Sequence, residues 1–256
     1  MTRVRVIPIL LMKSGGLHKS VKFSNHQYIG DPINAVRIFN EKEVDELILL
    51  DIAATSSNTA PDFSLLRTIA EEAFMPMAYG GGLASVEHAV QVLNCGFEKV
   101  VFNAAAINNP SLITEVAKLV GSSSVVVSID YAKDFWGKLK VYTNNGKVNT
   151  NLSPFALAKS AEQLGAGEII LNSIDRDGTY KGYDIATLSE LSRALSIPLI
   201  VAGGASGIDD FTQAIKAGAS AAAAGSMFVF RRPHNAVLIN YPTQKELKET
   251  LYANFK

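Results

Sequence analysis

Two glycine clusters occupy matching places in the two halves of this chain, and clusters of this kind bind phosphate groups. Residues 76–82 (PMAYGGG) return as residues 198–204 (PLIVAGG), with Gly81 and Gly82 in the first copy and Gly203 and Gly204 in the second. A glycine-rich turn that leads into a helix leaves backbone N–H groups free to hold an anion. The glycines could also serve tight turns alone. Their repetition favours a ligand with an anionic group at each end.

The second cluster has polar neighbours that could complete a phosphate site. Gly225 and Ser226 follow a further apolar run, and Asp177, Gly178 and Thr179 lie in the segment 175–179 (DRDGT) after another. Phosphate sites built from the loops after the last two strands are common in barrels. Taken alone, the DRDGT segment is explained equally well by an Asp-Gly turn.

Asp130 is the candidate for proton transfer. It follows the apolar run 125–129 (VVVSI), so it stands at the carboxyl end of a predicted buried strand. Partial burial raises the pKa of a carboxyl group toward neutrality, where general acid–base catalysis is most effective. The alternative is a structural Asp that caps a neighbouring loop.

Four charged residues stand at the opposite ends of the predicted strands: Arg5, Glu46, Lys99 and Glu168. Because side chains alternate between the two faces of a strand, Lys99 shares a face with Asn103, and Arg5 shares one with Leu11. If the strands close into a barrel and that face is its interior, two bases and two acids form a neutral ring across the floor of the barrel. A paired set of charges can be buried in this way. The alternative is ordinary solvated strand ends.

Short apolar runs alternate with amphipathic stretches along the whole chain, which is typical of successive strand–helix units. The strands are predicted at residues 4–11, 46–51, 75–79, 99–103, 125–130, 168–173, 199–202 and 220–224. Helix starts are predicted at Asp31-Pro32, Pro61, Asn109-Pro110, Ser153-Pro154 and the capping box from Thr243 to Glu246. With the half-length repeat, this pattern predicts an α/β fold: a single (β/α)8 TIM barrel over residues 1–256, with half-barrels at about 1–122 and 123–256.

Two loops after predicted strands are long. Residues 12–30 follow the first strand, and residues 131–152 read as a small hairpin that turns at Asn144-Asn145-Gly146. Insertions of this type lie at the face of a barrel where chemistry takes place.

Composition narrows the class of protein. Lysine plus arginine and aspartate plus glutamate are equal at 24 each, which argues against a nucleic-acid-binding protein. Cys95 is the only cysteine, and the four histidines lack metal-ligand spacing, so we expect no metal and no cofactor. No apolar run reaches the roughly 18 residues that span a bilayer, and the first residues do not resemble a secretory signal. We therefore expect a cytoplasmic protein without a membrane partner.

Motifs along nearly the whole chain resemble the cyclase subunit of imidazole glycerol phosphate synthase. They are Ile7-Pro8, Lys19, Gly30-Asp31-Pro32, 45–52 (DELILLDI), 80–82 (GGG), 103–105 (NAA), 128–130 (SID), 165–168 (GAGE) and 175–179 (DRDGT). In that family a glutaminase subunit docks on the barrel floor and releases ammonia. The ammonia passes a charged gate and the barrel interior to a ribonucleotide that bears two phosphates, which is cleaved and cyclised.

The resemblance implies a role for each matching residue. Arg5, Glu46, Lys99 and Glu168 would form the ammonia gate, and Asp130 would be one of two catalytic carboxylates. Lys19 would lie on the first loop beside the phosphorylated substrate. Gly81, Gly82 and Asn103 would hold one phosphate, and Asp177, Gly178, Thr179, Gly203, Gly204, Gly225 and Ser226 would surround the other. The partner would be a glutaminase on the face formed by the amino ends of the strands.

Two positions depart from the family. Its second catalytic carboxylate, at the end of the first strand, aligns with Leu11, and the Thr expected after Asn103 is Ala104. Leucine cannot transfer a proton, and loss of an acid–base partner removes about 10²–10⁴ in rate. The pattern resembles a divergent branch of the family in surface-polysaccharide pathways, where the barrel and its glutaminase supply ammonia to a separate enzyme that turns an N-acetyl sugar into an acetamidino sugar.

Three functions remain open on the sequence. The chain could be an ammonia-dependent cyclase of histidine biosynthesis despite Leu11, or the ammonia-channelling paralogue of lipopolysaccharide or capsule assembly. It could also be a scaffold that only activates a glutaminase. Asp130 and the two glycine clusters argue against the scaffold, which has no use for them. Leu11 argues against the cyclase.

Overall fold

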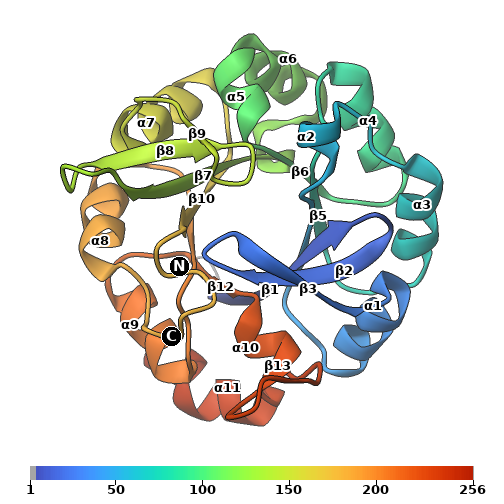
Figure 1. Cartoon of the computed structure of the whole chain (residues 1–256), viewed down its shortest axis with the longest axis vertical. Helices are drawn as coiled ribbons and strands as arrows, with labels where there is room; N and C mark the ends of the chain where they lie inside the picture. The colour runs from blue at the N-terminus through green and yellow to red at the C-terminus, as the bar shows by residue number, and fades with distance from the viewer. Residues whose placement is uncertain (1–3, 256) are drawn as a thin grey trace.

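Eight parallel strands close into a barrel in the computed structural model, which describes residues 4–255 (Figure 1). They are β1 (Arg5–Lys13), β4 (Leu47–Asp51), β5 (Met77–Gly80), β6 (Lys99–Phe102), β7 (Val125–Lys133), β10 (Glu168–Ser173), β11 (Leu199–Ala202) and β12 (Ala221–Ala224). The barrel closes where β12 pairs with β1, with Arg5 opposite Ala221. The predicted TIM barrel is confirmed. The predicted half-barrels begin at residue 1 and end at residue 256, both outside the described residues.

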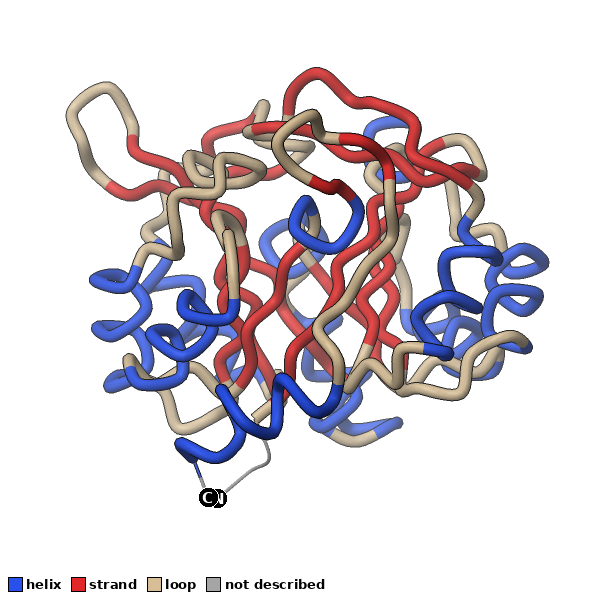
Figure 2. Tube along the Cα trace, turned by 90° about the horizontal axis from the view of Figure 1, so that it is seen from below, coloured by secondary structure: helices blue, strands red, loops and turns tan. Residues whose placement is uncertain are grey.

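Helices cover the outside of the barrel (Figures 1 and 2). The longer ones are α1 (Pro32–Glu41), α3 (Phe63–Glu71), α4 (Val86–Asn94), α6 (Ser111–Val120), α7 (Pro154–Leu164), α8 (Ile185–Ala194), α9 (Ile208–Lys216) and α11 (Gln244–Thr250). Short helical turns are α2 (Ala54–Ser57), α5 (Ala104–Asn108), α10 (Ser226–Val229) and the 3₁₀ segments Ser122–Ser124 and Tyr252–Phe255. Within the described part of the chain, no helix is both long and apolar enough to cross a bilayer.

The predicted helix caps are largely in place. The side chains of Asp31 and Ser153 accept hydrogen bonds from the first turns of α1 and α7, and Thr243 forms the expected capping box with Glu246. The start predicted at Pro61 is displaced: α3 begins after Asp62, whose carboxylate accepts from the amide of Leu65. A carboxylate satisfies a free N–H group that Pro61 cannot reach.

Alternation along the strands produces two separate apolar regions. Outward side chains pack against the helices, whereas inward ones form a second cluster along the barrel axis. The inner cluster comprises Ile7, Ile48, Ala78, Val101, Val126, Ile170, Ile200, Ala202, Ala221 and Ala223, with Ile9 and Leu50 packed against it. The barrel axis is therefore lined by aliphatic side chains between its floor and its mouth.

Two insertions rise over the mouth, which is the end formed by the carboxyl ends of the strands (Figure 2). The first is the hairpin of β2 (Gly16–Val21) and β3 (Ser24–Gly30), which continues antiparallel from β1. The second comprises the end of β7, β8 (Leu139–Thr143) and β9 (Val148–Asn149). A further small hairpin, β13 (Phe230–Arg231) with β14 (Ala236–Val237), follows α10.

The second insertion differs from the single hairpin predicted for residues 131–152. The turn at Asn144-Asn145-Gly146 is present, with positive φ at all three residues, but it joins β8 to β9. A second turn at residues 134–138 joins β7 to β8. There the Asp134 carboxylate accepts hydrogen bonds from the amides of Trp136 and Lys138 at 2.9 Å. A side chain therefore stabilises this turn, and no Asn-Gly pair marks it in the sequence.

Candidate functional site

The four charges predicted at the barrel floor point inward and meet. Arg5 donates to Glu46 and to Glu168, and the ammonium group of Lys99 donates to the same two carboxylates at 2.8 Å each. Both glutamates are buried. The two acidic partners outweigh burial and raise the pKa of the Arg5 guanidinium. The result is a closed, neutral ring of alternating acids and bases directly below the aliphatic lining.

At the mouth, Asp130 is held by two amide side chains. Asn172 on β10 donates to one carboxylate oxygen at 2.8 Å, and Asn103 after β6 donates to the other at 3.2 Å. Burial raises the pKa of Asp130 to about 7; the Asn172 hydrogen bond opposes the rise and the negative charge of Asp177 adds to it. A carboxyl group that titrates near neutrality can give or take a proton at physiological pH.

Asp130 lies at the boundary of two adjoining pockets. Leu50, Ile52 and Asn145 line both of them as well. The mouth thus offers two lobes on either side of one titratable carboxyl group.

The first lobe contains the first glycine cluster. Gly81, Gly82, Asn103 and Ala104 line it together with Asn144 of the β8–β9 turn. Gly82 has a φ of +67°, and a Cβ atom there would lie 2.5 Å from the carbonyl oxygen of Thr59. Chain packing alone therefore requires this glycine, so its presence does not distinguish a turn from a phosphate site.

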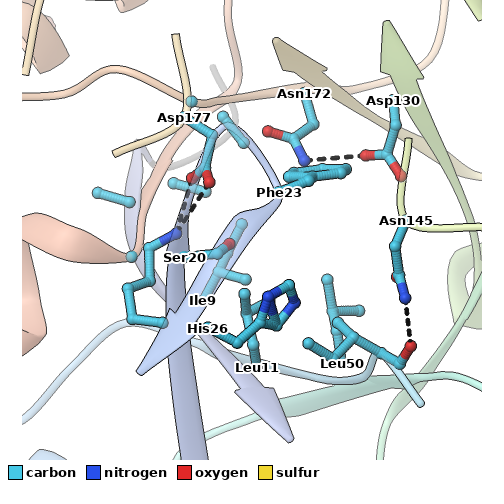
Figure 3. Close-up of a pocket in the computed structure, with 17 residues that line it drawn as sticks. Ile9, Leu11, Ser20, Phe23, His26, Leu50, Asp130, Asn145, Asn172 and Asp177 are labelled. Carbon is cyan, nitrogen blue, oxygen red and sulfur yellow. Dashed lines mark hydrogen bonds and ion pairs between the residues drawn. The ribbon is translucent and has the colours of Figure 1, made fainter. Parts of the chain in front are cut away.

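The second lobe, shown in Figure 3, contains part of the second cluster. Gly203 and Gly225 line it together with Lys19 and Asp177, which form an ion pair at 2.8 Å. The buried Lys19 side chain passes close over Gly225. The Lys19 ammonium group, which was expected beside a ligand, thus lies at the mouth, where it is held by Asp177 from the loop after β10.

The structure does not bring four of the predicted phosphate residues to the pocket walls. They are Gly178, Thr179, Gly204 and Ser226. The Thr179 hydroxyl donates to the carbonyl of Arg176 at 2.7 Å, and Tyr180 donates to the carbonyl of Ser226. Gly178, Thr179 and Gly204 lie in loops and Ser226 begins α10, all outside the pocket walls, so their binding role remains a prediction.

The second lobe also contains residues that sequence reasoning missed: Ser20, Phe23, His26, Asn145 and Asn172. Asn172 could have been found, because it lies four residues after Glu168 and so shares its inward face. The others come from the two insertions, whose pairing the sequence does not specify. Leu11 lines the same lobe, and the described residues include no cluster of three or more His, Cys, Asp or Glu side chains that could hold a metal.

Comparison with known proteins identifies the family. A family model described as "Histidine biosynthesis protein" matches residues 5–233. A Pseudomonas aeruginosa protein named "Putative imidazole glycerol phosphate synthase subunit hisF2" is 50% identical over 248 residues, covering 96% of this chain and 99% of the relative. A Leptospira interrogans protein named "Putative imidazole glycerol phosphate synthase subunit HisF" is 46% identical over 254 residues, 98% of this chain and all of the relative.

A more distant relative carries the same subunit name without the word "Putative". The "Imidazole glycerol phosphate synthase subunit HisF" of Thermococcus onnurineus is 39% identical over 249 residues, covering 96% of this chain and 94% of the relative. Full-length matches at this identity, together with the barrel and its inward-facing charges, fix the assignment. This chain belongs to the HisF family, that of the cyclase subunit of imidazole glycerol phosphate synthase.

Proposed function

We propose that this barrel receives ammonia from a glutaminase docked on its floor and conducts it to the mouth, for amidination of an N-acetyl sugar in surface-polysaccharide biosynthesis. Arg5, Glu46, Lys99 and Glu168 are the gate through which the ammonia enters. A phosphorylated ligand occupies the two lobes above, where Asp130 donates or accepts protons. The sugar is converted by a separate enzyme that takes the ammonia from this subunit.

The observation that carries the channel is the position of the charged ring directly beneath an aliphatic lining. All four charges of the ring are paired, so the ring presents no unpaired charge that would bind ammonia. Ile7, Ile48, Val101 and their neighbours above it offer no hydrogen-bonding groups. A small neutral molecule such as ammonia loses little hydration free energy along such a path and finds no group that would bind it. A cation would lose far more hydration free energy there.

Leu11 supports the paralogue over the cyclase of histidine biosynthesis. Leu11 lines the second lobe, where the family resemblance places a catalytic carboxylate. The acidic residues that do line this lobe are Asp130 and Asp177. Asp177 is paired with Lys19. The relatives at 45–50% identity have names that begin with "Putative" and end in hisF2, hisF3 or HisF, whereas the relatives named without that word are 39–40% identical.

The orthodox cyclase is the second candidate, and Asp130 favours it. A carboxyl group with a pKa of about 7, positioned by Asn103 and Asn172, is equipped for acid–base catalysis. A pure scaffold would need no such group.

Turnover separates the two candidates. The purified protein is supplied with ammonium and the bisphosphorylated ribonucleotide, and product formation is followed for the wild type, Leu11→Asp and the uncharged control Leu11→Asn. We expect a very slow wild type, a rate increase of about 10²-fold or more for Leu11→Asp, and no increase for Leu11→Asn. A wild-type rate in the range usual for enzymes, about 1–10³ s⁻¹, would establish the cyclase and remove the paralogue.

A further inference from the structure

The β2–β3 hairpin contains an irregularity directly over the mouth. Lys19 pairs with Gln27, but Val21 pairs with Ser24, so Ser20 faces two residues, Asn25 and His26. Asn25 has a left-handed φ of +54°, which accommodates the extra residue. A β-bulge of this kind redirects the neighbouring side chains and is common beside binding sites. Here it allows two successive residues, Lys19 and Ser20, to line the same pocket as His26.

Ser20 has an unsatisfied hydroxyl group. The residue is 2% exposed, and its Oγ atom has no hydrogen-bond partner among the described residues. A buried hydroxyl without a partner is unfavourable, and such groups in native proteins are normally satisfied by a ligand or a water molecule. Because Ser20 lines the second lobe, a ligand that enters the lobe can reach this hydroxyl and take the place of any water there.

His26 lies in the same part of the lobe. Figure 3 shows its ring near Ser20 and Leu11, with Asp130 and Asn172 at the other side of the pocket. Burial lowers the pKa of His26, and the positive charges of Lys13, His18 and Lys19 lower it further, while Asp177 opposes them. The imidazole is therefore mainly neutral at pH 7, when one ring nitrogen donates and the other accepts.

We propose that Ser20 and His26 form a neutral hydrogen-bonding subsite that holds an uncharged polar group of a phosphorylated ligand, an amide or a hydroxyl, against the apolar surface of Leu11. The bulge supplies the pair, and Leu11, Leu50 and Ile52 supply the apolar side. These two residues determine which ligand the lobe accepts. The subsite deepens the function proposed above and rests on it, since that function places a phosphorylated ligand in the lobes.

The hairpin is fixed in a position that suits this role. The ammonium group of Lys19 binds both carboxylate oxygens of Asp177, at 2.8 and 3.1 Å, and the amide of Lys22 donates to the carbonyl oxygen of Asp177 at 3.0 Å. Both contacts join the hairpin to the loop after β10, across the mouth. Ser20 lies between these two anchors, so its hydroxyl is held in place before any ligand arrives.

Binding experiments test the subsite. Isothermal titration calorimetry is performed on the whole protein with three probes: the bisphosphorylated ribonucleotide, N-acetylglucosamine 1-phosphate and inorganic phosphate. The variants are Ser20→Ala, His26→Leu and the control Gln27→Ala, which changes an exposed neighbour on β3. We expect Ser20→Ala and His26→Leu each to weaken the tighter-binding organic probe by about two- to tenfold, the effect of one lost hydrogen bond. Phosphate binding and the control should be unchanged.

The subsite would be overturned by wild-type affinity of both variants for the organic probes, or by organic probes that bind the wild type no more tightly than inorganic phosphate. An equal loss for phosphate would also count against it, because it would indicate a displaced hairpin rather than a lost contact. A ¹³C-imidazole NMR spectrum provides an independent check, since the His26 signal should shift on binding while that of His234 does not. The proposed function is judged separately by turnover, so either can fail alone.

Discussion

The charged ring at the barrel floor makes its own prediction for the substitution Lys99→Met. Lys99 donates to Glu46 and Glu168 at 2.8 Å each, and the two glutamate side chains are 4% and 5% exposed. Methionine keeps the length of the side chain but removes the charge and both hydrogen bonds. The ring then carries a net negative charge, with Arg5 as the remaining bridge between two buried carboxylates.

The expected cost follows from that geometry. Removing one partner of a buried ion pair costs about 3–5 kcal/mol, and the retained Arg5 bridge places this case near the lower end, about 3 kcal/mol. A chain of this size loses roughly 2–4 °C in Tm per kcal/mol. Thermal unfolding followed by circular dichroism should therefore show a decrease of roughly 6–12 °C.

A matched surface change provides the control. Lys118→Met removes an exposed lysine from the last turn of α6, and it should lower Tm by no more than about 2 °C. With a glutaminase present, Lys99→Met should also reduce product formed from glutamine more than product formed from added ammonium. If Lys99→Met melts together with Lys118→Met, the four charges are solvated independently and the reasoning about a paired ring is wrong.

Three further changes test other parts of the site. Asp130 has a pKa of about 7 in the folded protein against 3.8 for the free group, so folding binds a proton between pH 4 and 7 and the free energy of unfolding falls as pH rises through this range. Asp130→Asn lacks that fall, and its Tm relative to the wild type should rise by roughly a few degrees between pH 5 and pH 8. Gly82→Ala places a Cβ atom 2.5 Å from the Thr59 carbonyl oxygen at a φ of +67°, so urea denaturation should show a loss of about 2 kcal/mol or more. Phe135→Ser with Trp136→Ser changes side chains that are 93% and 81% exposed, and its Tm should stay within about 1–2 °C of the wild type.

Strand periodicity predicted which charges share a face, but not that this face is the interior. Each of the four charges lies at or just before the first residue of a strand, and the structure shows that they point inward and pair. Asp130 was predicted from a different signal, its place at the carboxyl end of the apolar run 125–129. These positions depend on local pattern and on barrel closure, both of which the half-length repeat makes visible.

Residues of the insertions escaped the same reasoning. Ser20 and His26 enter the pocket because the pairing of β2 with β3 shifts by one residue, and a one-residue shift changes which side chains face the pocket. The turn at residues 134–138 depends on hydrogen bonds that the Asp134 carboxylate accepts, and no dipeptide pattern identifies them. Register within a polar hairpin is set by tertiary contacts, here the contacts of Lys19 and Lys22 with Asp177, and so it is not encoded locally.

The two halves of the barrel share their acidic residue at the floor but differ elsewhere, since both bases of the ring, Arg5 and Lys99, lie in the first half. Glu46 and Glu168 are repeat equivalents and play the same part in the ring, whereas their companions one layer below the mouth, Leu50 and Asn172, differ. Asn172 orients Asp130, while Leu50 and Leu11 leave their side of the lobe apolar. Passage of a small neutral molecule requires only compensated charges and an apolar path, which the two halves supply together. The family resemblance implies that cyclisation uses two carboxylates and that Leu11 stands where one of them is expected, so we expect cyclisation to be impaired while ammonia transfer stays intact.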